Sequence, residues 1–359
     1  MARVKKGVTN KTEEVTNVSP EMQNLVEAMN KKFGKNAVRI GISKDKRKRE
    51  YISTGILQLD KDLNEGIPVG RVTEISGENH TGKSTLALHI MAEAQKKGLM
   101  CGLIDVEGTS DDIDYMNACG VDSSKLIISN PASLEEALAI AEMWQKSGEV
   151  HVCMFDSIAS SLATKTVLEA EIGESRRMGT PQQELAEYFI KYQMANNGLS
   201  REDSRPFTLI VINQLRSKIG AYGDPDYTPG GRAKEFAYSV RIRLRKGDWI
   251  KEKDTIVGQI TKYKIDKNKL GIPYRSGEVD FYFDENNSAG VPALNYDVFK
   301  DMVLVGVVLG VINKSGGWYS YHDIEKVQGI DKFTNELRQR EDLIEKLREE
   351  VLLVERGTK

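Results

Sequence analysis

Short apolar runs alternate with longer segments of helical periodicity between residues 51 and about 285. This alternation predicts an α/β fold with a mostly parallel twisted sheet, because parallel strands are buried on both faces and are joined by helices. The predicted strands are residues 72–76, 100–105, 126–129, 150–155, 209–213, 240–245 and 260–266. Ligands collect at the carboxyl ends of parallel strands, so we expect the chemistry of the protein at that edge of the sheet.

A separate amphipathic helix is predicted ahead of this region. Ser19, Pro20 and Glu21 suit an N-cap, a first helical position and an acidic first turn. Apolar residues then recur at helical spacing: Met22, Leu25, Val26, Met29 and Phe33. This stripe has to be buried, and two partners are open: the helix's own domain or a neighbouring subunit.

The flanks of the sheet region differ from it. Residues 1–18 are polar, charged and without periodicity, which predicts a flexible tail. Beyond the sheet region the pattern becomes mixed and apolar, and residues 331–354 predict a charge-rich helix. We therefore divide the chain into this tail, an N-terminal oligomerisation helix and linker at 19–46, a core at 47–285 and a small α+β C-terminal domain at 286–359.

Composition narrows the function classes. The chain has 359 residues, of which 40% are hydrophobic, and no run approaches the roughly 18 consecutive apolar residues of a membrane span. The first residues lack the apolar stretch of a signal peptide, so we expect a cytoplasmic protein without a membrane partner. The net charge of -2 provides no overall basic surface, so any DNA contact must come from local basic loops.

Cysteine and histidine do not predict a metal centre. Cys101, Cys119 and Cys153 are in no CxxC spacing, and two of them lie in apolar runs, so we interpret all three as reduced thiols in or near the core. The four histidines are scattered, without carboxylate or thiolate neighbours at ligand spacing.

A complete GxxxxGK[ST] motif comes directly after the predicted strand 72–76, and a helical pattern follows it. In such a loop, backbone N–H groups curl around phosphate oxygens, the lysine bridges the β- and γ-phosphates, and the last hydroxyl ligates Mg²⁺. The predicted nucleotide-binding residues are Gly77, Glu78, Asn79, His80, Thr81, Gly82, Lys83, Ser84 and Thr85. A catalytic role for the His80 ring is open, but we favour a contact through its backbone N–H.

Acids follow two more of the predicted strands. The apolar strand 150–155 leads to Asp156, which in a Walker B position would hold Mg²⁺ through a water molecule. The strand 100–105 supplies Asp105 and Glu107. ATP hydrolysis needs a base for the attacking water, and we choose Glu107 for this role. The alternative is that these acids are solvated loop charges.

Beyond these motifs, the chain resembles the bacterial RecA recombinase family along most of its length. The matching stretches, in the family's order, are NKKFGKNAVRIG, ISTGILQLD, GENHTGKST, LIDVEG, DYMNACGVD, FDSIAS, EAEIGES, INQLRSKIG, the pair Gly230 and Gly231, DKNKL and GGWYSY. The resemblance implies a RecA-like P-loop ATPase core, a Mg²⁺-ATP site between adjacent subunits and a helical homo-oligomeric filament on single-stranded DNA. It also implies strand exchange with homologous double-stranded DNA, DNA-stimulated ATP hydrolysis, and single-strand-binding and loader proteins as partners.

The resemblance also assigns roles by position. Lys83 and Ser84 match the phosphate and Mg²⁺ residues of the family. Glu107 matches the water-activating base, and Asp156 matches the Walker B acid. Gln214 matches a glutamine that senses the γ-phosphate and relays its presence to the DNA loop that follows. Without the resemblance, Gln214 would be an ordinary amide at a strand end.

Three further residues are assigned to the nucleotide in the same way. Lys267 and Lys269 match lysines that reach across the subunit interface to a neighbour's ATP. Tyr115 matches the aromatic residue that packs on adenine. By its position alone, Tyr115 would be interpreted as a core residue.

Two DNA-binding loops are implied, at about 169–182 and 214–233. Met178 in the first and Ile219 in the second match side chains that wedge between nucleotide triplets. The other implied DNA contacts are Arg176, Arg177, Gly179, Arg216, Lys218, Gly220, Gly230, Gly231 and Arg232. Both loops are basic, contain glycine and hold few large apolar side chains, which fits segments that order on nucleic acid and contact its phosphates.

The chain departs from the family in four places. Glu235 lies where a cationic interface residue is usual, so the coupling between neighbouring sites is in question. The segment NNGLSREDSRPF is longer than in the family, and one extra residue lies between Glu107 and Tyr115. The chain ends LLVERGTK, without the strongly acidic tail of many members.

Two other classes of protein stay open at this point. A RecA-fold DNA motor or helicase would need an appended domain, which no segment supplies. A non-hydrolysing filament modulator is disfavoured by the intact set of Lys83, Ser84, Glu107 and Asp156. The residues favour an ATP-dependent DNA recombinase.

Overall fold

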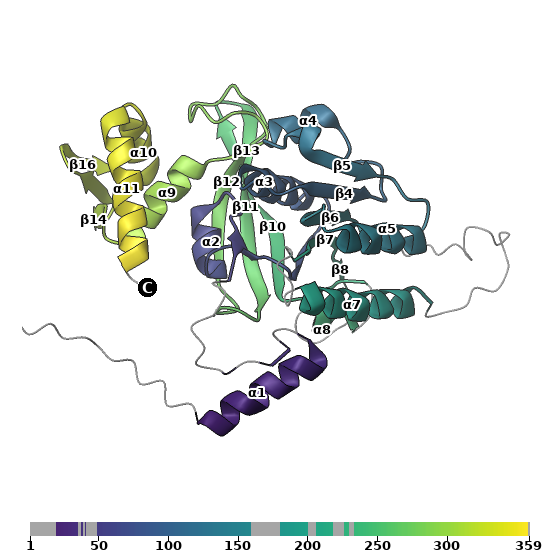
Figure 1. Ribbon diagram of the computed structural model, residues 1–359. Coiled ribbons are helices and arrows are strands. Elements are labelled where there is room, and N and C mark those ends of the chain that lie inside the picture. The colour runs from purple at the N-terminus through teal and green to yellow at the C-terminus, as the bar shows by residue number, and fades with distance from the viewer. Residues whose placement is uncertain are drawn as a thin grey trace, which may run out of the picture.

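The computed structural model describes residues 19–34, 37–38, 40, 49–158, 180–199, 206–217, 226–229 and 233–357. A nine-stranded sheet forms the centre of this part of the chain, in the order β13-β12-β11-β10-β3-β7-β6-β4-β5 (Figure 1). The strands are β3 (Val72–Gly77), β4 (Cys101–Asp105), β5 (Leu126–Ser129), β6 (Val152–Asp156), β7 (Thr208–Gln214), β10 (Val240–Glu252), β11 (Thr255–Asn268), β12 (Ser276–Tyr282) and β13 (Asn295–Tyr296). Each predicted strand is confirmed, although several of the ends differ.

Six neighbouring strands run parallel to one another: β10, β3, β7, β6, β4 and β5. Beyond β10, the strands β11, β12 and β13 continue the sheet in antiparallel pairs. The parallel pattern expected for the strand at 260–266 is therefore wrong. The cause is local, because the two residues between β10 and β11 form a hairpin turn with Lys253 at φ 54°, and a parallel crossover needs a much longer connection.

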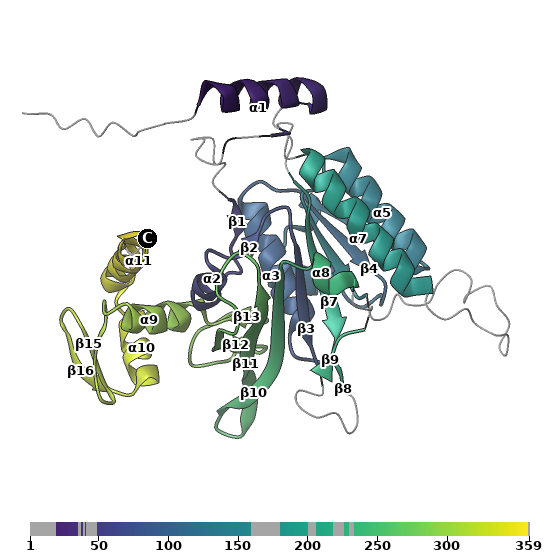
Figure 2. The same cartoon turned by 90° about the horizontal axis from the view of Figure 1, so that it is seen from below.

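Helices cover both faces of the sheet (Figure 2). They are α2 (Leu57–Leu63), α3 (Lys83–Lys96), α4 (Ile113–Ala118), α5 (Leu134–Ser147), α7 (Thr180–Leu199) and α8 (Ala233–Ala237), with a 3-10 turn at Ser123–Lys125. Successive strand residues enter opposite cores: Ile210 of β7 packs with α2 and α3, and Val211 packs with α5 and α7. All three cysteines are buried with free thiols, as predicted, and burial raises the pKa of Cys101 to about 12.

The helix α1 (Pro20–Phe33) begins where the sequence predicts. Ser19 caps it, and the Ser19 hydroxyl accepts a hydrogen bond from the backbone N–H of Met22 at 3.3 Å. The helix lies apart from the core in both views (Figure 1, Figure 2), and the described part of the chain buries none of its residues. Packing of the apolar stripe on the described part of the chain is therefore not what the structure shows.

The last part of the described chain packs around a core of its own. It consists of α9 (Val298–Val308), β14 (Asn313–Ser315), β15 (Trp318–Tyr321), β16 (Ile324–Gln328), α10 (Ile330–Arg338) and α11 (Glu341–Gly357). The single helix predicted at 331–354 is wrong, because the chain breaks between α10 and α11. Phe333 and Leu337 are four residues apart, as are Leu343 and Leu347, but six residues separate Leu337 from Leu343. Six residues turn a helix by roughly 600°, so only a break lets both pairs enter one core.

A buried acid joins this C-terminal part to the sheet region. Asp301 of α9 accepts hydrogen bonds from the backbone N–H groups of Leu57 at 2.6 Å and Gln58 at 3.3 Å, at the start of α2. Burial raises the pKa of Asp301 to about 7, against the effect of these two donors. Of the helices that the structure describes, none combines the length and the apolar character that crossing a membrane requires.

Candidate nucleotide and DNA site

The phosphate loop connects β3 to α3 at the carboxyl edge of the parallel strands. Gly77 ends β3 where a larger residue does not fit, because a Cβ there would lie 2.4 Å from Thr81 Oγ1 and 2.8 Å from the carbonyl oxygen of Leu244. Gly82 precedes α3 with φ 83°, in the left-handed region that favours glycine. These two glycines shape a tight loop that leads into the N-terminus of α3, where phosphates bind.

Lys83 begins α3 and folds back over the loop. Its Nζ donates a hydrogen bond to the carbonyl oxygen of Glu78 at 2.8 Å. Burial lowers the pKa of Lys83, although the negative charges of Asp156 and Glu107 counteract this shift. A largely buried cation is stabilised by an anionic partner, so the environment of Lys83 suits a bound phosphate.

Asp156, at the end of β6, lies beside this loop. Ser84 Oγ donates a hydrogen bond to Asp156 Oδ2 at 2.6 Å, and Ser110 Oγ donates to the same oxygen at 2.7 Å. Burial raises the pKa of the Asp156 carboxyl, against the effect of the two hydroxyl donors, and the charge of Glu107 adds to the rise. No sequence motif marks Ser110, because its contact with Asp156 depends on a turn that belongs to no motif.

The carboxylate of Glu107, which follows β4, contacts two neighbouring strand ends. Ser157 Oγ donates a hydrogen bond to Glu107 Oε1 at 2.7 Å. Gln214 Nε2, at the end of β7, donates to the same oxygen at 3.2 Å. The structure thus brings the predicted base and the predicted γ-phosphate sensor into direct contact.

Asp105, the acid that ends β4, has a different environment. Its buried carboxylate accepts hydrogen bonds from the backbone N–H groups of Glu107 at 3.1 Å, Gly108 at 2.9 Å and Ser110 at 2.8 Å. These three bonds shape the turn that carries Glu107. The geometry therefore gives Asp105 a structural role and leaves the exposed Glu107 as the acid that can meet a substrate.

Tyr115, on α4, lies beside the phosphate loop. Its hydroxyl oxygen is 2.6 Å from Thr85 Oγ1, one residue beyond Ser84 in α3. Burial raises the pKa of the Tyr115 hydroxyl. The extra residue before Tyr115 has therefore not moved the aromatic ring away from the nucleotide loop.

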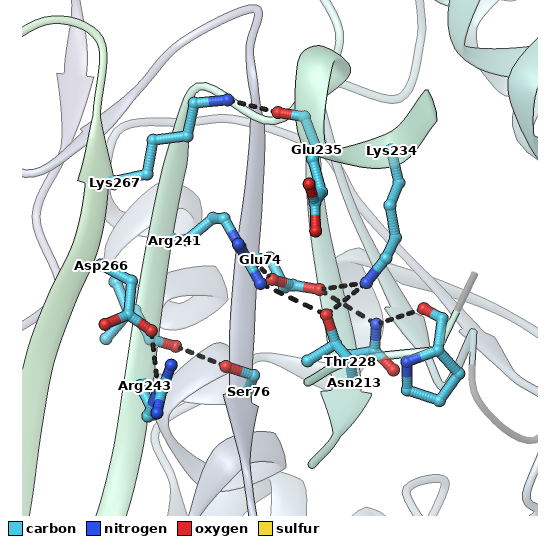
Figure 3. A network of polar contacts seen from close by, with 12 residues as sticks. Glu74, Ser76, Asn213, Thr228, Lys234, Glu235, Arg241, Arg243, Asp266 and Lys267 are labelled. Atoms are coloured by element: carbon cyan, nitrogen blue, oxygen red, sulfur yellow. Dashed lines mark hydrogen bonds and ion pairs between the residues drawn. The ribbon is translucent and has the colours of Figure 1, made fainter. Parts of the chain in front are cut away.

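Lys267 and Lys269, around the end of β11, contact the backbone of α8. Lys267 Nζ donates to the carbonyl oxygen of Glu235 (Figure 3), and Lys269 Nζ donates to that of Phe236 at 2.6 Å. Glu235 thus meets Lys267 through its backbone, and its own side chain is exposed.

Strand register places Lys267 away from the phosphate loop of its own chain. Lys267 pairs with Arg241 of β10, which pairs with Glu74 in the middle of β3. The phosphate loop starts beyond Gly77, at the carboxyl end of β3, three residues further along the strand than Glu74. The structure therefore does not bring Lys267 to the loop that contains Lys83.

Arg216 is a predicted DNA contact that lies within the described residues. It belongs to the short strand β8 (Arg216–Ser217), which pairs with β9 (Asp226–Tyr227) at the base of the second loop, and its side chain is exposed. The other predicted DNA contacts lie outside the described residues: Arg176, Arg177, Met178, Gly179, Lys218, Ile219, Gly220, Gly230, Gly231 and Arg232.

A phosphate loop between a strand and a helix, with an acid at the end of a nearby parallel strand, defines a P-loop ATPase. Residues 21–288 match the RecA N-terminal domain family, and residues 300–353 match the RecA C-terminal domain family. The chain is 39% identical to Protein RecA of Thermus aquaticus over 340 residues, which cover 94% of each chain. It is 38% identical to Protein RecA of Clostridium acetobutylicum over 345 residues, which cover 91% of this chain and 94% of that protein.

The chain belongs to the RecA family. It is an ATP-dependent DNA recombinase and a DNA-dependent ATPase of the RecA type, which binds ATP and DNA and associates with copies of itself. The resemblance inferred from the motifs is confirmed. The recombinase therefore replaces the two alternatives, a DNA motor or helicase and a non-hydrolysing filament modulator.

Proposed function

We propose that Glu107 is the base for ATP hydrolysis in this recombinase and that Gln214 couples hydrolysis to DNA. The observation that carries the proposal is the hydrogen bond from Gln214 Nε2 to Glu107 Oε1 at 3.2 Å. Gln214 ends β7 and begins the second DNA loop at 214–233. DNA that orders this loop would bias the position of a donor that touches the base.

ATP would lie along the phosphate loop, with its phosphates against the backbone of residues 77–85 and against Lys83 Nζ. Mg²⁺ fits beside them, because the Ser84 hydroxyl supplies a hard oxygen ligand and the Asp156 carboxylate, 2.6 Å from it, would hold the ion through a water molecule. Bound there, Mg²⁺ would neutralise charge on the phosphates. Tyr115, held at Thr85, would pack on the adenine ring.

Lys267 and Lys269 would bind the ATP of a neighbouring subunit. Their position away from the phosphate loop of their own chain supports this assignment, as does their contact with α8, whose Phe236 is 77% exposed. An interface with one partner's phosphate loop and the other partner's lysines is a head-to-tail contact, and such contacts extend into helical filaments where the rotation between subunits does not close a ring. The unburied apolar stripe of α1 would dock on the neighbour in the same filament.

The DNA contacts and the domain limits remain predictions of the sequence. Phosphate contacts are proposed for the basic residues of the loops at about 169–182 and 214–233, and for Arg216 among the described residues. The limits at 19–46, 47–285 and 286–359 are proposed together with them. Single-strand-binding and loader proteins are proposed as further partners.

The variant Glu107→Gln tests the catalytic proposal. An amide retains the size of the side chain but cannot take a proton, so we expect unchanged ATP binding and a loss of DNA-stimulated turnover of roughly 10²-fold or more. Lys83→Ala should weaken ATP binding as well, because it removes a cation from the phosphates. Glu149→Gln, an exposed acid that precedes β6, is the matched control and should be normal. Near-normal turnover in Glu107→Gln would remove this residue from the role of base.

A further inference from the structure

Four elements of the sheet region meet at one buried acid, Glu74 of β3, whose side chain is 0% exposed. Glu74 Oε1 accepts hydrogen bonds from Asn213 Nδ2 at 2.9 Å and Lys234 Nζ at 3.3 Å (Figure 3). Glu74 Oε2 accepts a hydrogen bond from Arg241 Nε at 2.6 Å. The partners belong to β7, α8 and β10, and the ATP chemistry described above uses none of these four side chains.

The Glu74 cluster, formed by Glu74, Asn213, Lys234 and Arg241, retains its charge inside the protein. Burial raises the pKa of Glu74, but Lys234 and Arg241 outweigh burial and lower that pKa below its ordinary value. Burial lowers the pKa of Lys234, which is 1% exposed, and the charge of Glu74 counteracts this shift. Buried charges are tolerated only where their geometry is well held, so the cluster restrains the segments that it joins.

The start of the second DNA loop is one of these segments. Asn213 immediately precedes Gln214 in β7. The Asn213 Nδ2 that binds Glu74 also donates a hydrogen bond to the carbonyl oxygen of Pro229 at 3.2 Å, close to the far end of the loop. One side chain at the start of the loop therefore contacts both the buried acid and the backbone near the other end of the loop.

The return of the loop is held by the same cluster. Thr228 Oγ1 accepts a hydrogen bond from Lys234 Nζ and another from Arg241 Nη2 at 3.3 Å (Figure 3). Thr228 belongs to the loop at 214–233 and is nevertheless buried. Its hydroxyl therefore holds this part of the loop against the cluster.

Strand register connects the cluster to the ATP site. Glu74 pairs with Val211 of β7, and three residues further along the same two strands Gly77 pairs with Gln214. The acid that holds the loop thus lies on the strand that carries the phosphate loop.

We infer that Lys234 and Glu74 are positioning residues that hold Asn213 and Thr228 of the second DNA loop against the phosphate-loop strand, so that DNA bound at this loop acts on the contact between Gln214 and Glu107. This inference rests on the roles proposed above for Gln214 and Glu107. Lys234 and Glu74 touch neither ATP nor DNA in this scheme, and they act through the backbone of the loop.

If the cluster served stability alone, substitutions in it would change the free energy of unfolding without changing the ratio of the ATPase rates with and without DNA. Removal of one partner of a buried ion pair is destabilising where it leaves the other charge unpaired. Lys234→Met retains most of the side-chain length and leaves Glu74 paired with Arg241 and Asn213. The fold should therefore survive, while Thr228 loses its contact with Lys234.

The experiment measures steady-state ATPase of the full-length chain with and without oligo(dT), at DNA concentrations that saturate each variant. The ratio of the two rates reports coupling separately from DNA affinity. We expect Lys234→Met to lower this ratio by about fivefold or more, with an unchanged DNA-free rate. Thr228→Val removes the hydroxyl at nearly constant shape and should lower the ratio as well, whereas Thr228→Ser retains the hydroxyl and should retain the ratio.

Thr261 provides the matched control for the valine variant. It is buried on β11, and its hydroxyl has no hydrogen-bond partner among the residues that the structure describes. Thr261→Val should therefore leave the ratio unchanged. A normal ratio in either Lys234→Met or Thr228→Val overturns the inference, and so does an equal loss of both rates that leaves the ratio intact. If Lys234→Met does not fold, the Thr228 pair decides the question.

Gln214→Ala separates this inference from the proposed function. A normal ratio in Gln214→Ala would refute the relay itself, whatever Lys234 does. A low ratio in Gln214→Ala with a normal ratio in Lys234→Met would refute only the positioning role. In the double variant, Lys234→Met should lower the ratio no further than Gln214→Ala does alone, because both act on one relay. Effects that multiply would show independent action and overturn the inference.

Discussion

At the scale of single residues, the phosphate loop leaves no space at Gly77. The nearest atoms to a Cβ there are Thr81 Oγ1 and the Leu244 carbonyl oxygen, at 2.4 Å and 2.8 Å. The second of these belongs to the backbone of β10, which cannot turn aside as a flexible side chain can. Any side chain at Gly77 therefore displaces the loop on which phosphate binding depends.

We expect Gly77→Ala to weaken ATP binding strongly, because a shift of about 1 Å in a binding site can reduce activity by about 10²-fold. Gly317 is the control, since a Cβ there would meet no described atom within 4 Å and its backbone is not left-handed. Gly317→Ala should bind ATP normally. Equilibrium binding of a fluorescent ATP analogue measures both variants, and normal affinity in Gly77→Ala would contradict the structure of the loop.

The chemical role of a residue was predictable from the sequence where the residue belongs to a motif. The phosphate loop, Asp156 and Glu107 were found in this way, because their spacing relative to strands is part of the chemistry. The contact of Ser110 with Asp156 was not predictable, since it depends on a turn held by three hydrogen bonds to Asp105. The cluster around Glu74 was missed for a related reason, because its members are far apart in the sequence and meet only across three strands and a helix.

At the scale of elements, the second DNA loop leaves the core through a two-stranded ribbon. The ribbon pairs Arg216 of β8 with Tyr227 of β9. Asp226 of β9 receives a hydrogen bond from Arg245 at 3.0 Å, which ties the ribbon to β10. Arg216 is exposed on this anchored base, so it can meet a phosphate with little further ordering of the backbone.

Arg216→Ala should weaken DNA binding to a similar degree on every base sequence. A phosphate contact releases about one counterion, so the slope of log affinity against log salt should become shallower by about 1. Lys146→Ala, on the exposed side of α5, is the control and should retain the original slope. Titration of DNA-stimulated ATPase with salt measures both, and an unchanged slope in Arg216→Ala would exclude a phosphate contact by this residue.

The sequence predicted most elements, because strand and helix periodicities differ clearly along this chain. It predicted the start of α1 from Ser19 and Pro20, whose preferences are local. It did not predict the antiparallel direction of β11, which follows from a short turn, or the break between α10 and α11. The first depends on the connection between two strands and the second on which side chains share a core, and the periodicity of a single segment contains neither.

At the scale of the whole molecule, two features are not explained by a single chain. The apolar stripe of α1 is not buried by the part of the chain that the structure describes. Lys267 and Lys269, around the end of β11, contact the backbone of α8 and lie away from the phosphate loop that begins beyond Gly77. Both features are explained if neighbouring subunits associate head to tail and complete each other's ATP site.

The most direct test of this account mixes two inactive variants. Lys83→Ala lacks the phosphate-loop cation, and Lys267→Ala lacks the cation that we assign to the neighbour's ATP. Each removal leaves phosphate charge uncompensated in a partly desolvated interface, where charge pairs are much stronger than at an exposed surface. Neither variant alone should show DNA-stimulated ATPase.

In an equal mixture with random order, about one quarter of head-to-tail interfaces combine an intact Lys83 with an intact Lys267. DNA-stimulated ATPase, measured in the mixture and in each separate sample, should therefore be partial in the mixture and absent from both single variants. Normal activity of Lys267→Ala alone, or a mixture as inactive as its components although both variants assemble on DNA, would contradict a shared ATP site.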